Sequence, residues 1–256
     1  MGVSQGVYAG VQQDEVPLTV EFPAEEAVEQ DHEWCLVRLG GETRRIRFHD
    51  YAAIYAIPGL YEHLFYERLE CCSPQTVISL LAHELRGEDV DPRGLRALDL
   101  GAGNGMVGEE LAELGAETIV GVDLIEEAAA AAERDRPGTY DAYFALDLTD
   151  PSPRAHDALS GFGFNCLACV AALGFGDIPP QVFTAAFDLL APGGWVAFNI
   201  KRDFLDDGDD TGFSRLIADL VASGALELRA RQPYRHRLST SGEALTYVAM
   251  VARKHA

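Results

Sequence analysis

Positive charge is the scarcest property of this chain. Its 256 residues include 20 lysines and arginines against 41 aspartates and glutamates, so the formal net charge is −21 at pH 7. Only two of the basic residues are lysines, Lys201 and Lys254. Basic clusters supply most of a protein's affinity for DNA, RNA and anionic membranes. The sequence therefore predicts no nucleic-acid partner and no membrane partner, and it favours a small molecule as the substrate.

Cysteine is also scarce, with five in the chain. This odd count, and the lack of a basic start and apolar core in the first fifteen residues, predict reduced thiols, no signal peptide and a cytoplasmic protein. Cys166 and Cys169 spell C-x-x-C, but residues three apart on a strand point to opposite faces, so they are not expected to pair or to chelate. The acidic stretch 203–210 lacks the ligand spacing of a calcium loop. No metal is expected.

Only one long stretch, 158–176, lacks charge, and it is long enough to be tested as a membrane span. Its four glycines and Asn165 favour instead a strand buried on both faces, with a turn on either side. Apolar residues make up 48% of the chain, which excludes wholesale disorder. The length fits one large domain, or one domain with an appendage.

The residues that are present divide the chain into three predicted parts: an acidic N-terminal arm at 1–33, a hairpin-and-helix cap at 34–94, and a main domain at 95–256. The arm carries eight acids and no lysine or arginine over 14–33, which is typical of a solvated, partly disordered tail. The cap begins with two β-prone runs around Gly40–Gly41. An aromatic segment at 49–70 follows, and then a helix with Ser73 as its expected cap.

From residue 96 onward, strand and helix patterns alternate. The predicted strands lie at 97–100, 118–122, 140–146, 164–170 and 195–200, and the predicted helices between them at 106–114, 124–135 and 180–190. This alternation indicates a parallel sheet with helices on both faces. A helix at 213–223 and two strands at 226–238 and 244–253 then predict an antiparallel hairpin at the edge. The expected fold class is a doubly wound, mostly parallel α/β sheet with this C-terminal hairpin and the N-terminal cap.

The strongest chemical signal is the loop that follows the first of these strands. Asp99 is followed by alternating glycines at 101, 103 and 105, and then by a helix. Glycines let a backbone approach a ligand closely, and a helix start offers free N–H groups. Residues 103–108 also match the dinucleotide pattern G-x-G-x-x-G, and a glycine turn can serve packing alone. However, a carboxylate at position 99 would repel a pyrophosphate and attract an ammonium group.

Acids also end the next two predicted strands. Asp123 stands about twenty residues after the glycines, where an acid can accept both ribose hydroxyls of an adenosine. Asp147 follows the third strand and could accept a hydrogen bond from an adenine amino group. A helix cap at Asp123 and a turn at Asp147 are the alternatives. The ribose interpretation suits a nicotinamide cofactor equally well.

Taken together, these motifs resemble the class I S-adenosylmethionine-dependent methyltransferases over about 95–253. The resemblance rests on Asp99 with the glycine loop, on VDL at 122–124, on ALDLTD at 145–150, and on LLAPGGWVAFNI at 189–200. It is strongest to the small-molecule group, such as quinone-biosynthesis and natural-product enzymes. It implies a seven-stranded sheet, S-adenosylmethionine as the cofactor and S-adenosylhomocysteine as the product.

The resemblance also implies roles for particular residues. Gly101, Ala102, Gly103, Gly105, Cys169 and Val170 would line the methionine part of the cofactor, with Asp99 facing its ammonium group. Asp123 would hold the ribose, with Leu124 beside the adenine and Asp147 and Leu148 at the adenine edge. Tyr51, in the aromatic segment, is expected to help to cover the cofactor.

The catalytic group is harder to predict. His236, beside the final hairpin, is the candidate general base, and Tyr55 of the aromatic segment is a second candidate, whereas His49 is expected to be a solvent or packing residue. The acceptor is expected to offer an oxygen or nitrogen nucleophile. A nicotinamide-dependent oxidoreductase, a protein methyltransferase and a binding module without activity remain alternatives. The oligomeric state is open, with a homodimer as one possibility.

Overall fold

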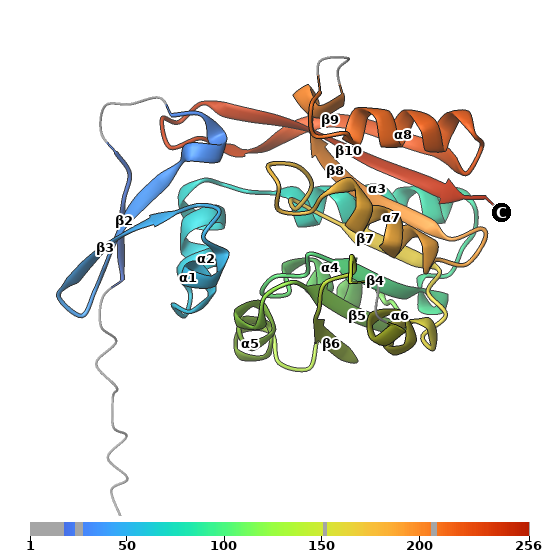
Figure 1. Ribbon diagram of the computed structural model, residues 1–256, viewed down its shortest axis with the longest axis horizontal. Coiled ribbons are helices and arrows are strands. Elements are labelled where there is room, and N and C mark those ends of the chain that lie inside the picture. Colours follow the sequence, from blue (N-terminus) through green and yellow to red (C-terminus); the bar gives the residue numbers. More distant parts are fainter. Residues whose placement is uncertain (1–17, 24–27, 151–152, 206–208, 256) are drawn as a thin grey trace, which may run out of the picture.

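The computed structural model describes residues 18–23, 28–150, 153–205 and 209–255. Its centre is a seven-stranded sheet in the order β6-β5-β4-β7-β8-β10-β9 (Figure 1). The strands are β4 (Arg96–Leu100), β5 (Thr118–Asp123), β6 (Ala142–Ala145), β7 (Cys166–Cys169), β8 (Trp195–Lys201), β9 (Leu226–Leu238) and β10 (Ala244–Lys254). The first five are parallel, whereas β10 pairs antiparallel with both β8 and β9. The predicted fold class is confirmed.

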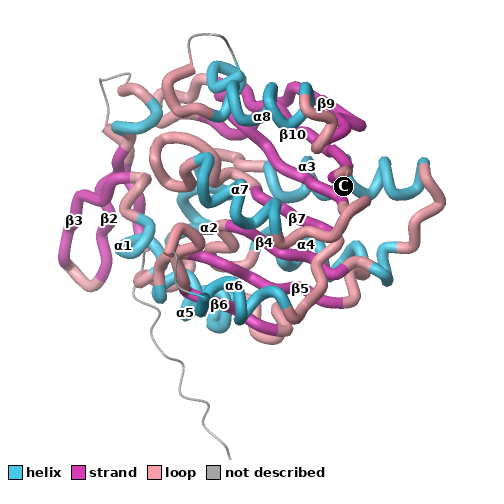
Figure 2. Tube along the Cα trace, turned by 45° about the vertical axis from the view of Figure 1, so that its right-hand side comes forward, coloured by secondary structure: helices cyan, strands magenta, loops and turns pink. Residues whose placement is uncertain are grey.

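Helices cover both faces of this sheet (Figure 2). On one face, α3 (Ser73–Gly87) and α4 (Met106–Leu114) share an apolar cluster with the strands. On the other, α6 (Pro153–Ser160), α7 (Pro180–Asp188) and α8 (Phe213–Ala222) contribute to a larger cluster. Strands β4, β7 and β8 are buried along almost their whole length, as their unbroken apolar runs predict.

Local structure departs from the predictions at two places. The sequence patterns miss α6, an eight-residue helix that ends inside the uncharged stretch 158–176. Ser73 is the first residue of α3 and not its cap, because Cys72 holds that position. The Ser73 hydroxyl instead lies 2.6 Å from both the Tyr234 hydroxyl and His236 Nδ1.

A second, three-stranded antiparallel sheet belongs to the N-terminal part. It consists of β1 (Thr19–Glu21), β2 (Trp34–Leu39) and β3 (Glu42–Arg47), and a 3₁₀ helix, η1 (Gln30–His32), precedes β2. The hairpin turns at Gly40 and Gly41, where φ is positive as a tight turn requires. The prediction of a solvated tail is therefore wrong for the described residues 18–23 and 28–33, since β1 pairs with β2 and buries Val20.

The cap continues through α1 (Tyr51–Tyr55), α2 (Leu60–Glu62) and a π-helical turn, η2 (His63–Arg68). Figures 1 and 2 show α1 and α2 beside the small sheet, next to the carboxyl-terminal side of the main sheet. The cap has its own apolar cluster, which includes Phe48, Ile54 and Leu64. Tyr55 instead packs on Ala128 and Ala131 of α5 (Glu126–Asp135), and so joins the cap to the main domain.

A buried ion pair also joins the N-terminal segment to the main domain. Glu33 is fully buried and pairs with Arg237 of β9, while its other carboxylate oxygen accepts from the Thr240 backbone N–H at 2.6 Å. The Arg237 guanidinium lies over the rings of Phe48 and Phe65. Since both charges are desolvated, removal of either partner would leave an uncompensated buried charge.

Candidate active site

A cavity of about 560 Å³ lies at the carboxyl ends of β4, β5, β6 and β7, with residues of α1 in its wall. In the strand order, β4 stands between β5 and β7, and the chain reverses its direction of growth there. Open α/β sheets bind ligands at such a switch point. The site residues predicted from the sequence that line the cavity are Tyr51, Tyr55, Gly101, Asp123, Leu124, Asp147, Leu148 and Val170.

The glycine loop turns sharply between β4 and α4. The backbone N–H groups of Gly101 and Ala102 both donate to the Val122 carbonyl, at 2.8 and 3.1 Å. Gly101 has φ +71°, and a Cβ added there would lie 2.8 Å from Ala172 Cβ and 2.9 Å from Ile178 Cδ1. A side chain at this position would therefore displace the cavity wall, so glycine lets the backbone itself form the surface.

Tyrosine side chains cover the rest of this loop. A Cβ added at Gly103 would overlap the Tyr55 hydroxyl, and Tyr143 donates to the Gly103 carbonyl at 2.8 Å. A Cβ at Gly105 would lie 3.2 Å from the Tyr140 ring. In consequence Ala102, Gly103 and Gly105 are not among the described residues of the cavity lining.

Asp123 ends β5 and is fixed by backbone donors. Its Oδ2 accepts from Gly103 N–H at 3.0 Å, and its Oδ1 accepts from Leu124 N–H at 2.7 Å. Burial raises the pKa of its carboxyl group, while these N–H groups act in the opposite direction. Leu124, beside it, is 64% exposed and lines the cavity, so it offers apolar surface to a ligand there.

Asp147 and Leu148 form the adjoining wall after β6. Asp147 Oδ1 accepts from the Thr149 backbone at 2.8 Å and from the Thr149 hydroxyl at 2.7 Å. The side chain is thus held in a turn, as one of the two interpretations of the sequence expects. The same turn directs both residues to the cavity, so the structural and the binding roles are compatible.

Asp99 lies behind the glycine loop and is not in the described lining. It is fully buried, its Oδ2 accepts from the Tyr140 hydroxyl at 2.8 Å, and its Oδ1 has no hydrogen-bond partner among the described residues. Burial raises the pKa of this carboxyl group to about 7, although the Tyr140 hydrogen bond opposes the rise. Cys169 is also fully buried away from the described lining, and burial raises the pKa of its thiol well above the usual range.

The cap supplies aromatic side chains to the opposite wall. The rings of Tyr51 and Tyr55 stack at 6.1 Å, and Tyr61 lies 5.0 Å from Tyr55. Two arginines hold this wall in place. Arg134 Nη1 donates to the Tyr55 carbonyl at 3.0 Å, and Arg136 Nη1 donates to Glu62 at 2.7 Å.

His236 is not among the described residues that line this cavity. It is 5% exposed, hydrogen-bonded to Ser73 through Nδ1, and stacked on the Tyr247 ring at 4.1 Å. Burial, and then the neighbouring Arg237 charge, lower the pKa of its imidazole well below the usual range. The geometry gives His236 a packing role between α3 and the final hairpin, and it does not favour the predicted role as general base. Tyr55, the second candidate, does line the cavity.

The cavity wall also contains a histidine–aspartate pair that the sequence patterns did not indicate. His49 Nδ1 lies 2.8 Å from Asp177 Oδ2, and both residues line the cavity. They are 128 positions apart, and neither belongs to the family motifs. The sequence signal that was available is the pair of glycines at 174 and 176, which indicates a tight turn after β7, just before Asp177.

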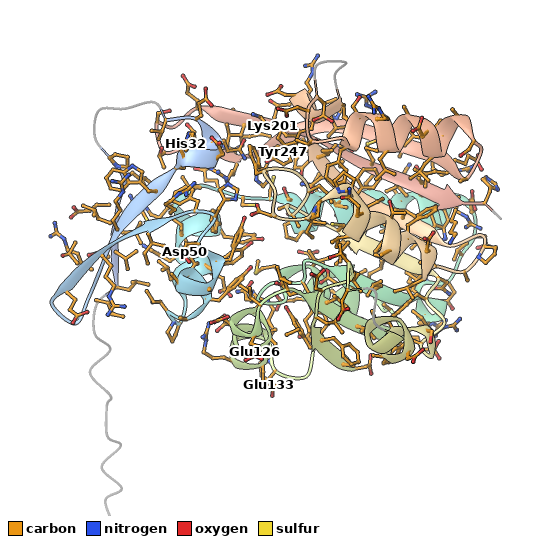
Figure 3. All side chains as sticks on the ribbon, in the orientation of Figure 1. His32, Asp50, Glu126, Glu133, Lys201 and Tyr247 are labelled. Atoms are coloured by element: carbon orange, nitrogen blue, oxygen red, sulfur yellow. The ribbon has the colours of Figure 1, made fainter. Side chains whose placement is uncertain are left out.

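A second cavity, of about 830 Å³, shares part of this wall. Gly176, Ile178 and Pro179 line both cavities, while Phe175 and Lys201 belong to the second. Figure 3 labels Lys201 and Tyr247, which are register partners on β8 and β10. Within the described parts of the chain, no helix combines the length and the apolar run that a bilayer crossing demands.

Related proteins match this chain in sequence. A family model described as a methyltransferase domain matches residues 71–246. The ubiquinone biosynthesis O-methyltransferase of Burkholderia vietnamiensis is 33% identical over 111 residues, which are 41% of this chain and 44% of that protein. The protein of the same name from Thiobacillus denitrificans is 33% identical over 106 residues, with the same coverage. The chain thus matches less than half the length of these curated relatives.

Solved structures share the fold. The N-methyltransferase NodS from Bradyrhizobium japonicum WM9, in complex with S-adenosyl-L-homocysteine, matches with a TM-score of 0.54 and 16% identity, over 81% of this chain and 97% of that chain. Thermoplasma acidophilum 1320 matches with a TM-score of 0.51 and 14% identity, over the same shares. Because the family model spans well over half of the chain, and the strand order and glycine loop agree with it, the chain belongs to the methyltransferase family, as a class I S-adenosylmethionine-dependent methyltransferase.

Proposed function

We propose that this protein transfers the methyl group of S-adenosylmethionine to an oxygen or nitrogen of a small molecule. The observation that carries the proposal is the cavity itself. Its volume of about 560 Å³ lies in the range of pockets that enclose drug-sized ligands, and tyrosines of the cap form one wall.

The residues at one end of the cavity suit an adenosyl group. Asp123 is positioned to accept the ribose hydroxyls, because its backbone donors fix the carboxylate and its oxygens retain further lone pairs. Leu124 and Leu148 offer apolar surface to the adenine, and Asp147 offers an acceptor at its edge. Gly101 and Val170 would lie along the methionine part. Asp99 would act from behind the loop, since its buried carboxyl does not reach the cavity.

The bound cofactor supplies an electrophilic methyl group on a positively charged sulfur. The protein must then align the acceptor and exclude water. Water would be excluded by the rings of Tyr51, Tyr55 and Tyr61, which close the cavity on the side of the cap. The ion pair between Arg136 and Glu62 keeps this wall against the glycine loop.

The name of the curated relatives, ubiquinone biosynthesis O-methyltransferase, supports a small-molecule acceptor, and an oxygen nucleophile in particular. The cytoplasm is the compartment we propose, which the five unpaired cysteines favour. A protein substrate remains a second candidate only through the acidic net charge, which suits basic peptides. The nicotinamide alternative is set aside because the family is that of methyltransferases.

The test is calorimetric titration of the protein with S-adenosylmethionine, S-adenosylhomocysteine and NAD. We expect the first two to bind and NAD not to bind. Asp123→Ala should weaken binding of S-adenosylhomocysteine at least tenfold, because a buried hydroxyl pair loses its acceptor. Glu133→Ala is the matched control, since it removes an exposed acid of α5 outside the described lining. Equal affinity in the two variants would contradict the assignment of Asp123.

A further inference from the structure

We infer that His49 and Asp177 form the proton-accepting pair of this enzyme, and that the acceptor is therefore a neutral hydroxyl compound, most simply a phenol. This inference rests on the proposed function and names the group within the same cavity that would activate the substrate. It replaces His236, the base expected from the sequence.

The contact between the two side chains has the geometry of a base and its orienting acid. His49 Nδ1 lies 2.8 Å from Asp177 Oδ2, with side-chain exposures of 20% and 26%. A carboxylate accepts only, so in the neutral ring the hydrogen bond to Asp177 requires the proton on Nδ1 and leaves Nε2 as an acceptor. Nε2 has no hydrogen-bond partner among the described residues. The pair is thus half-buried, fixed through Nδ1, and part of the cavity wall.

The loop after β7 is built to hold Asp177 in this position. Ala171 and Phe175 both have positive φ, at +57° and +53°, although neither is glycine. The Asp177 backbone N–H closes the turn on the Gly174 carbonyl at 3.1 Å. Left-handed conformations of such residues cost free energy and persist where their surroundings hold them, which is common at functional sites.

Aromatic rings fix the imidazole from two sides. The Phe175 ring lies 5.4 Å from the His49 ring, and the Tyr51 ring lies 6.0 Å away, almost perpendicular. These contacts place aromatic ring surface beside the imidazole. An aromatic acceptor packs well against such surfaces, so a phenolic hydroxyl is the substrate group that this wall fits best.

The pair also occupies the correct end of the cavity. Asp147 and Leu148 line the end that we assign to the adenine, whereas His49 and Asp177 line the wall made by the cap and the loop after β7. Gly176 lines both this cavity and the second one, so the second cavity adjoins the wall that carries the pair.

The proposed step couples methyl transfer to the loss of the hydroxyl proton. The acceptor oxygen forms a bond to the methyl carbon while the carbon–sulfur bond breaks, and sulfur keeps the bonding electrons. The hydroxyl proton passes to His49 Nε2, and the imidazolium is stabilised by the Asp177 carboxylate. Water removes the proton afterwards. An uncharged amine needs this base less, because its nitrogen is a stronger nucleophile than an uncharged hydroxyl oxygen and can lose its proton to water after the transfer.

Other titratable or charged groups lie near the residues that contact His49. Asp50 and Tyr51 follow it in the chain, and Lys201 of β8 lies 5.5 Å from the centroid of the Phe175 ring. Besides burial, Asp177, Arg237 of β9 and Tyr247 of β10 each influence the pKa of Tyr51. Burial raises the pKa of Tyr51 well above its usual range and that of Tyr247 to about 12. Neither tyrosine therefore titrates near neutral pH.

The test compares His49→Gln and Asp177→Asn with His83→Gln, which removes an exposed histidine of α3 outside the described lining. Hydroxybenzoates and the matching aminobenzoates serve as probes. We expect His49→Gln to lower kcat for hydroxyl probes by about 10²- to 10⁴-fold and Asp177→Asn by at least tenfold. Raising the pH should restore activity to His49→Gln, because the probe then ionises without a base.

Two readouts other than turnover complete the test. Calorimetry should show the same affinity for S-adenosylhomocysteine in all three variants. Nitrogen-15 NMR of labelled histidine should show the His49 proton on Nδ1. The inference is overturned by an unprotonated Nδ1 in the neutral ring, by undiminished turnover in His49→Gln, or by turnover of amines alone. Absence of cofactor binding in the unmodified protein would instead refute the proposed function.

Discussion

Asp99→Asn should remove the part of the pH dependence of stability that comes from the buried carboxyl group behind the glycine loop. The carboxyl group is fully buried, and its pKa is about 7 in the fold against an ordinary value of 3.8. The folded state therefore holds the proton more tightly than the unfolded chain does. Stability from this group is present below pH 3.8 and is lost as the pH rises toward and through 7.

The size of the effect follows from the two pKa values. Their difference of about three, at ~1.36 kcal/mol for each tenfold change, gives a total of about 4 kcal/mol. About 2.5 kcal/mol of this falls between pH 5 and pH 8, because the carboxyl of the unfolded chain is already mostly ionised at pH 5. Asparagine keeps the shape and can still accept from the Tyr140 hydroxyl. Its buried amide N–H groups add a cost, but that cost does not depend on pH.

Urea unfolding of both proteins at pH 5 and pH 8, followed by the fluorescence of Trp34 and Trp195, measures the difference. The free energy of unfolding of the unmodified protein should fall by about 2.5 kcal/mol more than that of Asp99→Asn. His236, whose pKa is lowered by burial, acts in the opposite direction below pH 6.5 but is present in both proteins and cancels. Glu133→Gln, at an exposed acid, should behave as the unmodified protein does. Parallel pH dependences would refute a buried, protonated Asp99.

Three further predictions test the surrounding structure. Tyr140→Phe removes the hydrogen bond that holds down the pKa of Asp99, so the loss of stability should extend to higher pH in the same unfolding experiment. Glu33→Ala should lower the free energy of unfolding by about 3–5 kcal/mol, because Arg237 would stay buried without a partner, whereas Glu42→Ala on the exposed hairpin should change it by less than about 1 kcal/mol. Gly101→Ala should abolish calorimetric binding of S-adenosylhomocysteine while the far-ultraviolet circular dichroism is kept, because its Cβ would lie 2.8 Å from Ala172; retained binding would move the cofactor away from this loop.

The main sheet was predictable because its signals are local. Strand and helix patterns alternate along the chain, and buried parallel strands such as β4 and β8 are apolar without interruption. The edge hairpin was equally predictable, since β9 and β10 are long and joined by a short polar turn. Helix α6 was missed because it is short and polar and its last residues belong to an uncharged stretch that continues into a strand.

The acidic arm shows how tertiary contacts override composition. Eight acids without a basic residue favour a solvated tail, but Glu33 gains a buried partner in Arg237, which lies 204 positions away. No pattern near Glu33 in the sequence predicts that partner. Val20 likewise becomes buried only because β1 adds to the hairpin of β2 and β3. Charge patterning is informative about isolated segments, and it fails where a distant surface supplies the counter-charge.

The same distinction separates the two halves of the candidate site. That Gly101, Asp123 and Asp147 line one cavity was predictable, because each ends or follows a strand and parallel strands bring their carboxyl ends to one edge. The acceptor end depends on a cap that precedes the sheet and on a loop that follows its fourth parallel strand. His49 has no motif around it, and it acquires a role only where the left-handed turn at Phe175 brings Asp177 to its Nδ1. In this chain the proposed acceptor residues are therefore brought together by contacts between distant elements, whereas the proposed cofactor residues lie at the ends of strands.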